Sequence, residues 1–178
     1  ALSYDGSRVA IGAPGNDGNG SSSGHVRIYD YNGTAWVQVG GDIDGEAADD
    51  NSGYSVSLSS DGSVVAIGAP YNDANGANSG HVRIYNYQVV SGTLTWTQLG
   101  GDIDGPKLDT SFGESVSLSS DGSRVAIGMP RLDSGNVGWG NDQRGGARVY
   151  EYIGNNWSQL GDDMVGETTF DSFGNSVS

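Results

Sequence analysis

The chain has 178 residues, of which 35 % are hydrophobic, and a net charge of −14 from 22 acidic and 8 basic residues. This length predicts one domain or part of a larger one, and the negative charge argues against binding to nucleic acid. Apolar runs of only a few residues exclude insertion into a membrane. The lack of cysteine excludes disulfides and zinc–thiolate sites, and the 31 glycines predict many tight turns.

The segment 55–70 predicts two strands joined by a tight turn. In "SVSLSS", Val56 and Leu58 alternate with serines, which is typical of a half-buried strand. Asp61-Gly62 then indicates a two-residue type I′ turn, in which both residues have positive φ. The apolar run "VVAIGAP" predicts a strand covered on both faces and ended by its proline.

Two further strands follow in the predicted order. "HVRIYNY" (81–87) places Val82 and Ile84 on one face of a third strand. In the first unit, Asn32-Gly33 marks the next turn, and "AWVQVG" is the fourth strand. No segment shows helical periodicity, so the sequence predicts an all-β chain.

These phrases recur three times in the same order. The Asp-Gly pairs that start at residues 5, 61 and 121 stand 56 and 60 residues apart. The units span approximately 1–56, 57–116 and 117–178, and each starts partway through the strand pattern. Four strands in each unit predict β-propeller-type blades, which are four-stranded antiparallel sheets that stack on neighbours to bury both faces. Residues 1–178 are thus predicted to form a single repeat domain.

The two ends of the chain fall at one point of the repeat, because Ala1 aligns with Ser57, Ser117 and Ser178. Two explanations stay open at this point. Either a longer array is cut there, or the C-terminal "FGNSVS" supplies the strand that is missing before Ala1. The second arrangement is the one that closes ring-shaped propellers.

The stretch "SFGESVSLSSDGSRVAIGMP" (111–130) resembles an FG-GAP repeat, the blade unit of integrin α-subunit propellers and of many secreted microbial proteins. The repeat is named after a Phe-Gly and a Gly-Ala-Pro. Here these are Phe112-Gly113, Phe173-Gly174, Gly12-Ala13-Pro14, Gly68-Ala69-Pro70 and the variant Gly128-Met129-Pro130. The sequence departs from the pattern at Ser52, where Phe is expected, and at Met129 in place of Ala.

The resemblance implies a β-propeller, usually extracellular or on the cell surface, that serves adhesion, display or ligand binding. Seven blades are usual in the integrin-like members, and three units are too few for that ring. We therefore expect a fragment of a longer propeller, a ring completed by self-association, or an open array with edge strands free to pair.

Calcium is the cofactor that the resemblance suggests, although the Asp-x-Asp-x-Asp-Gly loop of integrin-like blades is absent from "SSDGS". The loops after Gly-Ala-Pro offer Asp17, Asn19, Asp73, Asn75 and Asp133. A weaker pair of clusters lies in the two "GDIDG" segments, at Asp42, Asp44, Asp102 and Asp104. The alternative is that these side chains form Asx turns and solvated loop tips. The third unit weakens the second set, because Val165 stands at the position of Asp104.

Histidines and large aromatic residues recur with the repeat. His25 and His81 share one position, where the alignment places Ala147 in the third unit, and we expect them to pack at a blade interface. The recurring aromatic residues are Trp36, Trp96, Trp157, Tyr29, Tyr85 and Tyr150. Packing between blades is favoured for these rings over stacking on sugars.

Features that occur in one unit only predict a specific contact. Trp139, with Arg131 and Arg144 near it, lies in a long loop without a counterpart. Sequons for glycosylation occur at Asn19, Asn32 and Asn156, in predicted loops or turns.

No residue set converges on an enzyme. The sequence therefore predicts a non-enzymatic, extracellular structural or adhesive repeat module that associates with a protein partner or with itself. The alternative is a carbohydrate- or protein-binding propeller with calcium-supported loops.

Overall fold

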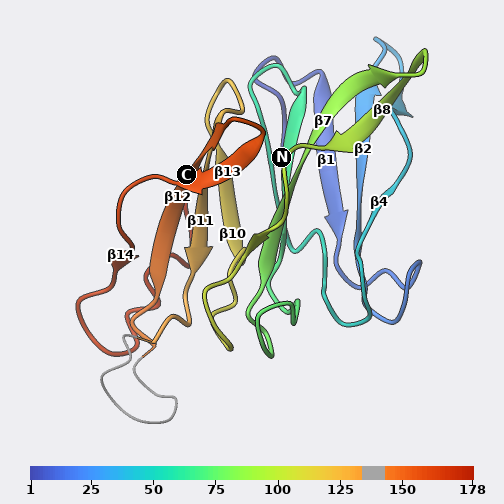
Figure 1. The fold of residues 1–178 in the computed structure, drawn as a ribbon. Coiled ribbons are helices and arrows are strands. Elements are labelled where there is room, and N and C mark those ends of the chain that lie inside the picture. The colour runs from blue at the N-terminus through green and yellow to red at the C-terminus, as the bar shows by residue number, and fades with distance from the viewer. Residues whose placement is uncertain (134–142) are drawn as a thin grey trace.

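A computed structural model describes residues 1–133 and 143–178, which form three antiparallel sheets and no helix (Figure 1). Sheet 1 contains β1 (Arg8–Ala13), β2 (His25–Tyr31), β3 (Trp36–Gln38) and β4 (Ile43–Asp44). Sheet 2 contains β5 (Ser55–Leu58), β6 (Val64–Ala69), β7 (His81–Val90), β8 (Thr93–Gln98) and β9 (Ile103–Asp104). Sheet 3 contains β10 (Ser115–Leu118), β11 (Arg124–Met129), β12 (Gly146–Ile153), β13 (Asn156–Gln159) and β14 (Met164–Val165). The prediction of an all-β chain is confirmed.

Each sheet is a meander whose outermost strand is broken in two. In sheet 2, β5, β6, β7 and β8 pair in chain order, and β9 then pairs with β7 on the same side as β8. Tyr85 lies opposite Gln98, and Val82 lies opposite Ile103. Between these two pairs, β7 has two residues and the outer strand has four. Such a bulge redirects the side chains beside it. The fourth strand that the sequence predicts is therefore present as two short pieces.

The three sheets stand side by side in chain order, and two apolar clusters fill the spaces between them (Figure 1). Strand β6 contributes to both clusters, because Val65 and Ile67 belong to one, and Val64 and Ala66 to the other. All six residues of β6 are buried, which confirms the prediction of a strand covered on both faces. The described residues contain no helix that could cross a membrane. They also do not close into a ring, so the number of blades stays a prediction.

The glycines of the FG-GAP motif stack on one another between consecutive units. A Cβ atom on Gly12 would lie 1.9 Å from the carbonyl oxygen of Gly53, and one on Gly68 would lie 2.0 Å from that of Gly113. No side chain fits in such a space. The glycine that precedes one sheet, which follows Ser52 in the first case and Phe112 in the second, therefore lies directly on the Gly-Ala-Pro glycine of the preceding sheet. The C-terminal Gly174 covers Gly128 in the same way.

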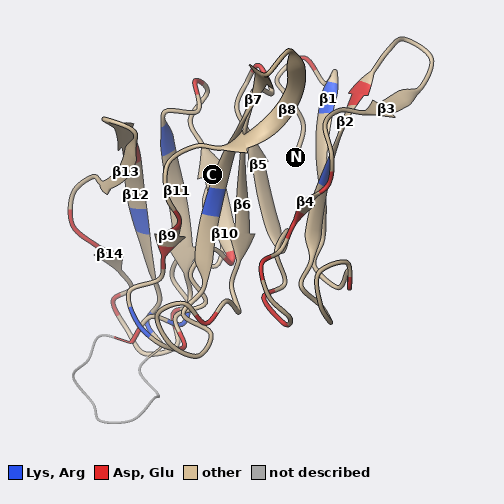
Figure 2. Ribbon diagram, turned by 45° about the vertical axis from the view of Figure 1, so that its right-hand side comes forward, with Lys and Arg blue, Asp and Glu red and all other residues tan. Residues whose placement is uncertain are grey.

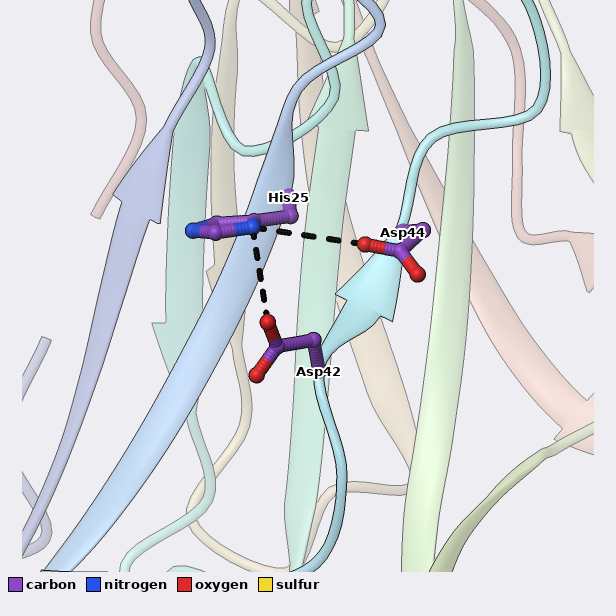
Figure 3. A group of neighbouring side chains, drawn as sticks. All are labelled: His25, Asp42 and Asp44. Carbon is purple, nitrogen blue, oxygen red and sulfur yellow. Dashed lines mark ion pairs between the residues drawn. The ribbon is translucent and has the colours of Figure 1, made fainter. Parts of the chain in front are cut away.

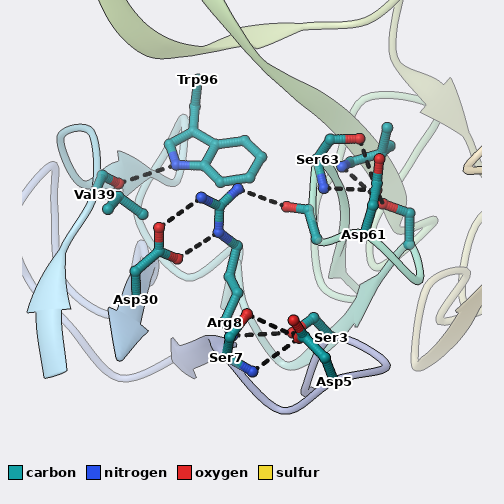
Figure 4. A network of polar contacts seen from close by, with 12 residues as sticks. Ser3, Asp5, Ser7, Arg8, Asp30, Val39, Asp61, Ser63 and Trp96 are labelled. Carbon is teal, nitrogen blue, oxygen red and sulfur yellow. Dashed lines mark hydrogen bonds and ion pairs between the residues drawn. The ribbon is translucent and has the colours of Figure 1, made fainter. Parts of the chain in front are cut away.

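The Asp-Gly hairpins differ from the predicted type I′ turn. Among the three Asp-Gly pairs, only the glycines have positive φ, for example 69° at Gly62. The Gly62 N–H donates to the Ser59 carbonyl at 2.9 Å, so a four-residue turn ends on a left-handed glycine inside a longer loop. The carboxylate of Asp61 explains the change, because it accepts hydrogen bonds from Ser59 Oγ, Ser63 N and Ser63 Oγ. Figure 4 shows this network around Asp5 and Asp61.

Candidate functional site

Two clusters centre on repeat-equivalent buried histidines at the starts of β2 and β7. His25 opens β2 and pairs across the sheet with Asp44, and His81 opens β7 and pairs with Asp104. Cross-strand partners have their side chains on one face. The repeated sequence therefore brings an imidazole and carboxylates together twice, at the point where the outer strand resumes after its bulge. Figure 2 shows acidic segments at β4 and in the loops beside it.

The first cluster joins His25 to two carboxylates (Figure 3). Its Nδ1 atom lies 3.8 Å from Asp42 Oδ2 and 4.0 Å from Asp44 Oδ1. Both distances exceed a hydrogen bond. The side chain of His25 is 8 % exposed, whereas both carboxylates reach solvent.

Neighbouring side chains hold Asp42 in place. Arg27 donates to both of its oxygens, at 3.0 and 2.8 Å, and Gln38 Nε2 donates at 2.7 Å. These hydrogen bonds, first of all those of Arg27, lower the pKa of Asp42 to about 2. The carboxylate is therefore charged at neutral pH.

The second cluster crosses from one unit to the next. Glu46, which follows β4 of sheet 1, brings Oε2 to 3.9 Å from Nδ1 of His81. Arg83 NH1 lies 3.2 Å from the other oxygen, Oε1, and Arg83 NH2 donates to the Asp44 carbonyl at 2.9 Å. Asp102 completes the group, whose three ligand atoms lie within 4.8 Å of one another.

Two polar atoms beside this cluster are buried without a hydrogen-bond partner: Nδ1 of His81 and Oδ1 of Asp104. The side chain of His81 is only 2 % exposed. Burial lowers the pKa of His81 to about 4, so its imidazole is neutral at neutral pH. Burial, followed by the nearby charge of Asp102, raises the pKa of Asp104. A buried nitrogen lone pair or N–H without a partner is costly and calls for an explanation.

The third unit lacks the cluster, and its alignment needs a correction. The strand register places Gly146, not Ala147, opposite Met129, as His81 is opposite Ala69. A Cβ atom on Gly146 would lie 2.7 Å from Leu132 Cδ2 and 3.0 Å from Met129 Cε. The large Met129 side chain thus occupies the space that the histidine has in the other units.

The loops after Gly-Ala-Pro use their predicted metal ligands in hydrogen bonds of their own. Asp17 Oδ1 accepts from Ser22 N, and Asp73 Oδ1 accepts from Asn78 N, both at 2.8 Å. The side-chain amide of Asn19 donates to the Gly45 carbonyl at 2.8 Å. These side chains thus hold the loop closed on itself or against the segment after β4, and their contacts span more residues than those of an Asx turn.

The remaining members of that set behave similarly. Asn75 Nδ2 donates to the Gly105 carbonyl at 3.0 Å, and Lys107 Nζ donates to the Asp133 carbonyl. Among the described residues, the groups of three that could hold a metal include none of the five loop residues. The first two of these loops each contain one carboxylate, that of Asp17 or Asp73, whereas calcium takes six to eight oxygen ligands. Calcium at these loops stays a prediction.

Trp139, the central residue of the predicted unit-specific contact, lies outside the described residues. Arg131 is exposed, and the carbonyl of Arg144 accepts a hydrogen bond from Phe173 N at 2.9 Å. The sequon residues Asn19, Asn32 and Asn156 are exposed. Asn156 is the first residue of β13 and does not lie in a turn.

The recurring tryptophans pack between sheets where a preceding unit exists. Trp96 is 9 % exposed and donates Nε1–H to the Val39 carbonyl at 3.1 Å, and Trp157 donates to the Leu99 carbonyl at 2.7 Å. Packing, the favoured interpretation, is confirmed for these two. Trp36 has no such bond among the described residues and is 46 % exposed.

A small pocket adjoins the first cluster between sheets 1 and 2. Its volume is about 220 Å³, and its lining includes Asp42, Asp44, Tyr85 and Trp96. Carboxylates on one wall and aromatic rings on the other suit a polar ligand with an apolar face.

Comparison with known proteins supports the resemblance that the sequence indicates. Residues 43–85 match the family model described as FG-GAP repeat. No curated protein sequence matches the chain. Among solved structures, the chain is similar to a predicted 6-phosphogluconolactonase from Bacteroides uniformis, with 14 % sequence identity and a TM-score of 0.54. The match covers 96 % of this chain and 40 % of that one, and at this identity it shows the fold alone.

Proposed function

We propose that this chain, which carries an FG-GAP repeat at residues 43–85, is a non-enzymatic structural or adhesive module that associates with further copies of itself. The module acts outside the cell, where FG-GAP repeats typically occur. The observation that carries this proposal is the pair of contacts between consecutive units, which repeats within the chain and leaves matching halves at its two end faces.

Each contact between units contains the same elements. A tryptophan of the later unit donates its indole N–H to a carbonyl of the earlier unit, as Trp96 does to Val39. The ring also lies over a glycine of the earlier unit, because a Cβ atom on Gly40 would lie 2.6 Å from Trp96 Cδ1. Trp157 stands in the same relation to Leu99 and Gly100.

Within the described residues, the outer faces of sheet 1 and sheet 3 each carry one half of this contact. On sheet 1, Val9, Ile11, Tyr29 and Trp36 line an apolar groove of about 390 Å³. On sheet 3, Leu160 and Gly161 occupy the positions of Leu99 and Gly100, and a Cβ atom on Gly161 would touch nothing within 4 Å. Exposed apolar side chains continue this face: Met164, Val165, Phe170 and Phe173. Exposed apolar patches of this kind mark sites of association.

A head-to-tail contact between copies would reproduce the internal contact. Trp36 of one copy would then lie on Gly161 of the next and donate to the carbonyl of Leu160. Such a contact closes into a ring if the rotation between units allows it, and otherwise forms an open filament. The absence of cysteine and the acidic charge are compatible with a secreted module.

Sedimentation velocity across a wide range of protein concentrations tests this proposal. We expect the mass to rise with concentration, the Trp36→Asp variant to stay monomeric, and the control Val89→Asp to associate like the parent protein. Val89 is exposed at the tip of the β7–β8 hairpin, away from the end faces. A parent protein that is monomeric throughout contradicts the proposal, as does a Trp36→Asp variant that still associates.

The non-enzymatic part needs its own test. The name of the similar Bacteroides uniformis protein describes that protein's activity, and a 14 % identity gives no ground for transferring it. Incubation of the purified chain with 6-phosphogluconolactone should leave the hydrolysis rate at its background value. Hydrolysis that scales with protein concentration would refute the non-enzymatic role.

The pocket beside Asp42 supports a second candidate, a carbohydrate-binding module with calcium-supported loops. Thr95 lies at its lining, and Thr95→Arg would fill it, whereas Thr93→Arg on the exposed end of the same strand is the control. A glycan array measured with and without calcium tests this candidate. Binding that Thr95→Arg removes and Thr93→Arg keeps supports it, and an array without hits rules it out.

A further inference from the structure

The buried imidazole nitrogens of His25 and His81 face carboxylates but make no hydrogen bond within the described part of the chain. Nδ1 of His81 is fully buried and unpartnered, with Glu46 Oε2 at 3.9 Å. Nδ1 of His25 lies 3.8 and 4.0 Å from Asp42 and Asp44. A repeat-equivalent histidine thus faces carboxylates twice, although Glu46 of the preceding unit takes the place in the second cluster that Asp44 has in the first.

We propose that each of these clusters binds one divalent transition-metal ion of the zinc type. The first site consists of His25, Asp42 and Asp44, and the second of Glu46, His81 and Asp102. In both sites the histidine ligates through Nδ1 and the two carboxylates ligate through one oxygen each. This inference is independent of the proposed association of copies.

The spacing of the ligand atoms fits an ion between them. Zinc lies about 2.0–2.2 Å from imidazole nitrogen and from carboxylate oxygen, so two ligands of one ion stand at most about 4.3 Å apart. The separations of 3.8–4.0 Å from Nδ1 to the oxygens of Asp42, Asp44 and Glu46 fall within this limit and beyond hydrogen-bond distance. All ligand atoms of each group, that of Asp102 included, lie within 4.8 Å of one another, so an ion would draw the carboxylates closer by rotation of their side chains.

The ligand types select a transition metal over calcium. Calcium and magnesium prefer all-oxygen sites, whereas an imidazole with carboxylates suits zinc, manganese, cobalt, nickel or copper. Three protein ligands leave at least one position for water. The site therefore differs from the calcium loops that the sequence suggests, in its donor atoms and in its place on the sheet.

Arginines beside the clusters orient the carboxylates: at Glu46 the ligand oxygen is not the one nearest the arginine, whereas at Asp42 the ligand oxygen Oδ2 also accepts a hydrogen bond from Arg27 NH2 at 2.8 Å. Arg83 lies 3.2 Å from Oε1 of Glu46 and leaves Oε2 directed at His81. Arg27 and Gln38 likewise fix Asp42. Outer contacts of this kind are typical of metal sites, where they set the direction of each ligand.

The second site would connect two units. Glu46 belongs to the first unit, and His81 and Asp102 to the second, so an ion between them joins sheet 1 to sheet 2. The first site lies within sheet 1 and its adjoining segment. We therefore expect metal to raise the thermal stability chiefly through the second site, since binding to the folded state alone shifts the unfolding equilibrium.

Calorimetric titration of the metal-free, tag-free protein with Zn²⁺ tests the proposal. We expect two ions for each chain, one ion for His25→Gln or His81→Gln, and none for the double variant. Asp163→Asn is the matched control, because Asp163 occupies the position of Asp42 in the unit without a histidine. This variant should still bind two ions, and Ca²⁺ in excess should not displace them.

A second measurement covers the case in which a histidine variant fails to fold. Glu46→Gln keeps the size of the side chain, and we expect it to weaken binding at one site at least tenfold, in line with the effect of altered metal-site contacts. Nitrogen-15 NMR of the histidine rings should show both Nδ1 signals shifting on addition of Zn²⁺. Unshifted ring signals, or two ions still bound by the double histidine variant, would overturn the proposal.

Discussion

Replacement of Trp96 by alanine tests how consecutive units hold together. The ring packs on Tyr87 at a centroid distance of 4.9 Å, and its Nε1–H donates to the Val39 carbonyl of the previous unit. The guanidinium of Arg8, from the same previous unit, lies 5.9 Å from the ring. Figure 4 shows Trp96 and Arg8 together with Val39 and Asp30.

The magnitude follows from the burial of the ring. Trp96 is 9 % exposed, and truncation of a buried tryptophan costs about 3–5 kcal/mol. The lost hydrogen bond to Val39 adds about 1 kcal/mol. We therefore expect the free energy of unfolding to fall by about 4–6 kcal/mol. Trp36→Ala is the matched control, because Trp36 has the same repeat position but is 46 % exposed, and its loss should cost about 1 kcal/mol.

Equilibrium unfolding in urea measures both variants, at a protein concentration at which sedimentation shows monomers. The expected difference of about 3–5 kcal/mol between them exceeds the error of extrapolation. Equal losses for Trp96→Ala and Trp36→Ala would refute the reasoning, because they would mean that the contact with the previous unit contributes nothing. A dependence of the Trp36→Ala loss on protein concentration would instead report association through that face.

Three further predictions concern the motif glycines, the motif phenylalanine and the hairpins. Gly68→Ala places a methyl group 2.0 Å from the Gly113 carbonyl and should prevent cooperative unfolding seen by circular dichroism, whereas Gly101→Ala, with open space around it, should be nearly neutral. Phe112→Ser removes a fully buried ring and should lower the unfolding free energy by about 3–5 kcal/mol in urea. Neighbouring serines lower the pKa of Asp121 to about 2, so its contribution is complete above pH 4 and is lost as the pH falls toward 2. The difference in melting temperature between the parent protein and Asp121→Asn should therefore vanish in acid, and a constant difference would contradict this assignment.

The sequence was sufficient for the features that depend on local pattern. The inner strands of each sheet are predicted by the apolar run at 64–69 and by the alternation in the strands before and after it. A strand that is buried on both faces is rich in apolar residues along its whole length. The repeat spacing likewise predicts three equivalent sheets. The hairpin was misjudged because Asp61 has a negative φ and uses its carboxylate to hold two serines, and an Asp-Gly pair is compatible with either turn.

The candidate site could be predicted only in part. The sequence indicates Asp42, Asp44 and Asp102 as metal ligands. It favours packing for the two histidines and gives no sign that Glu46 takes part. Glu46 reaches His81 only because sheet 1 and sheet 2 lie side by side. No sequence pattern within one unit predicts this contact between Glu46 and His81. The available signal is a recurring histidine at the start of a β-strand, followed in the same two units by a GDIDG segment.

The third unit shows that packing alone does not require the histidine. There Met129 replaces an alanine and Gly146 replaces the histidine, so the two cross-strand partners exchange a small and a large side chain. Leu132 and Val165 replace an asparagine and an aspartate around them. An entirely apolar set thus satisfies the same sheet geometry without any buried unpartnered nitrogen. Because the fold accepts the apolar set, the polar set in the first two units needs an interaction that offsets the free-energy cost of burying its polar atoms. A bound cation supplies that interaction, and this argument favours a metal ion at His25 and His81 over a purely structural role.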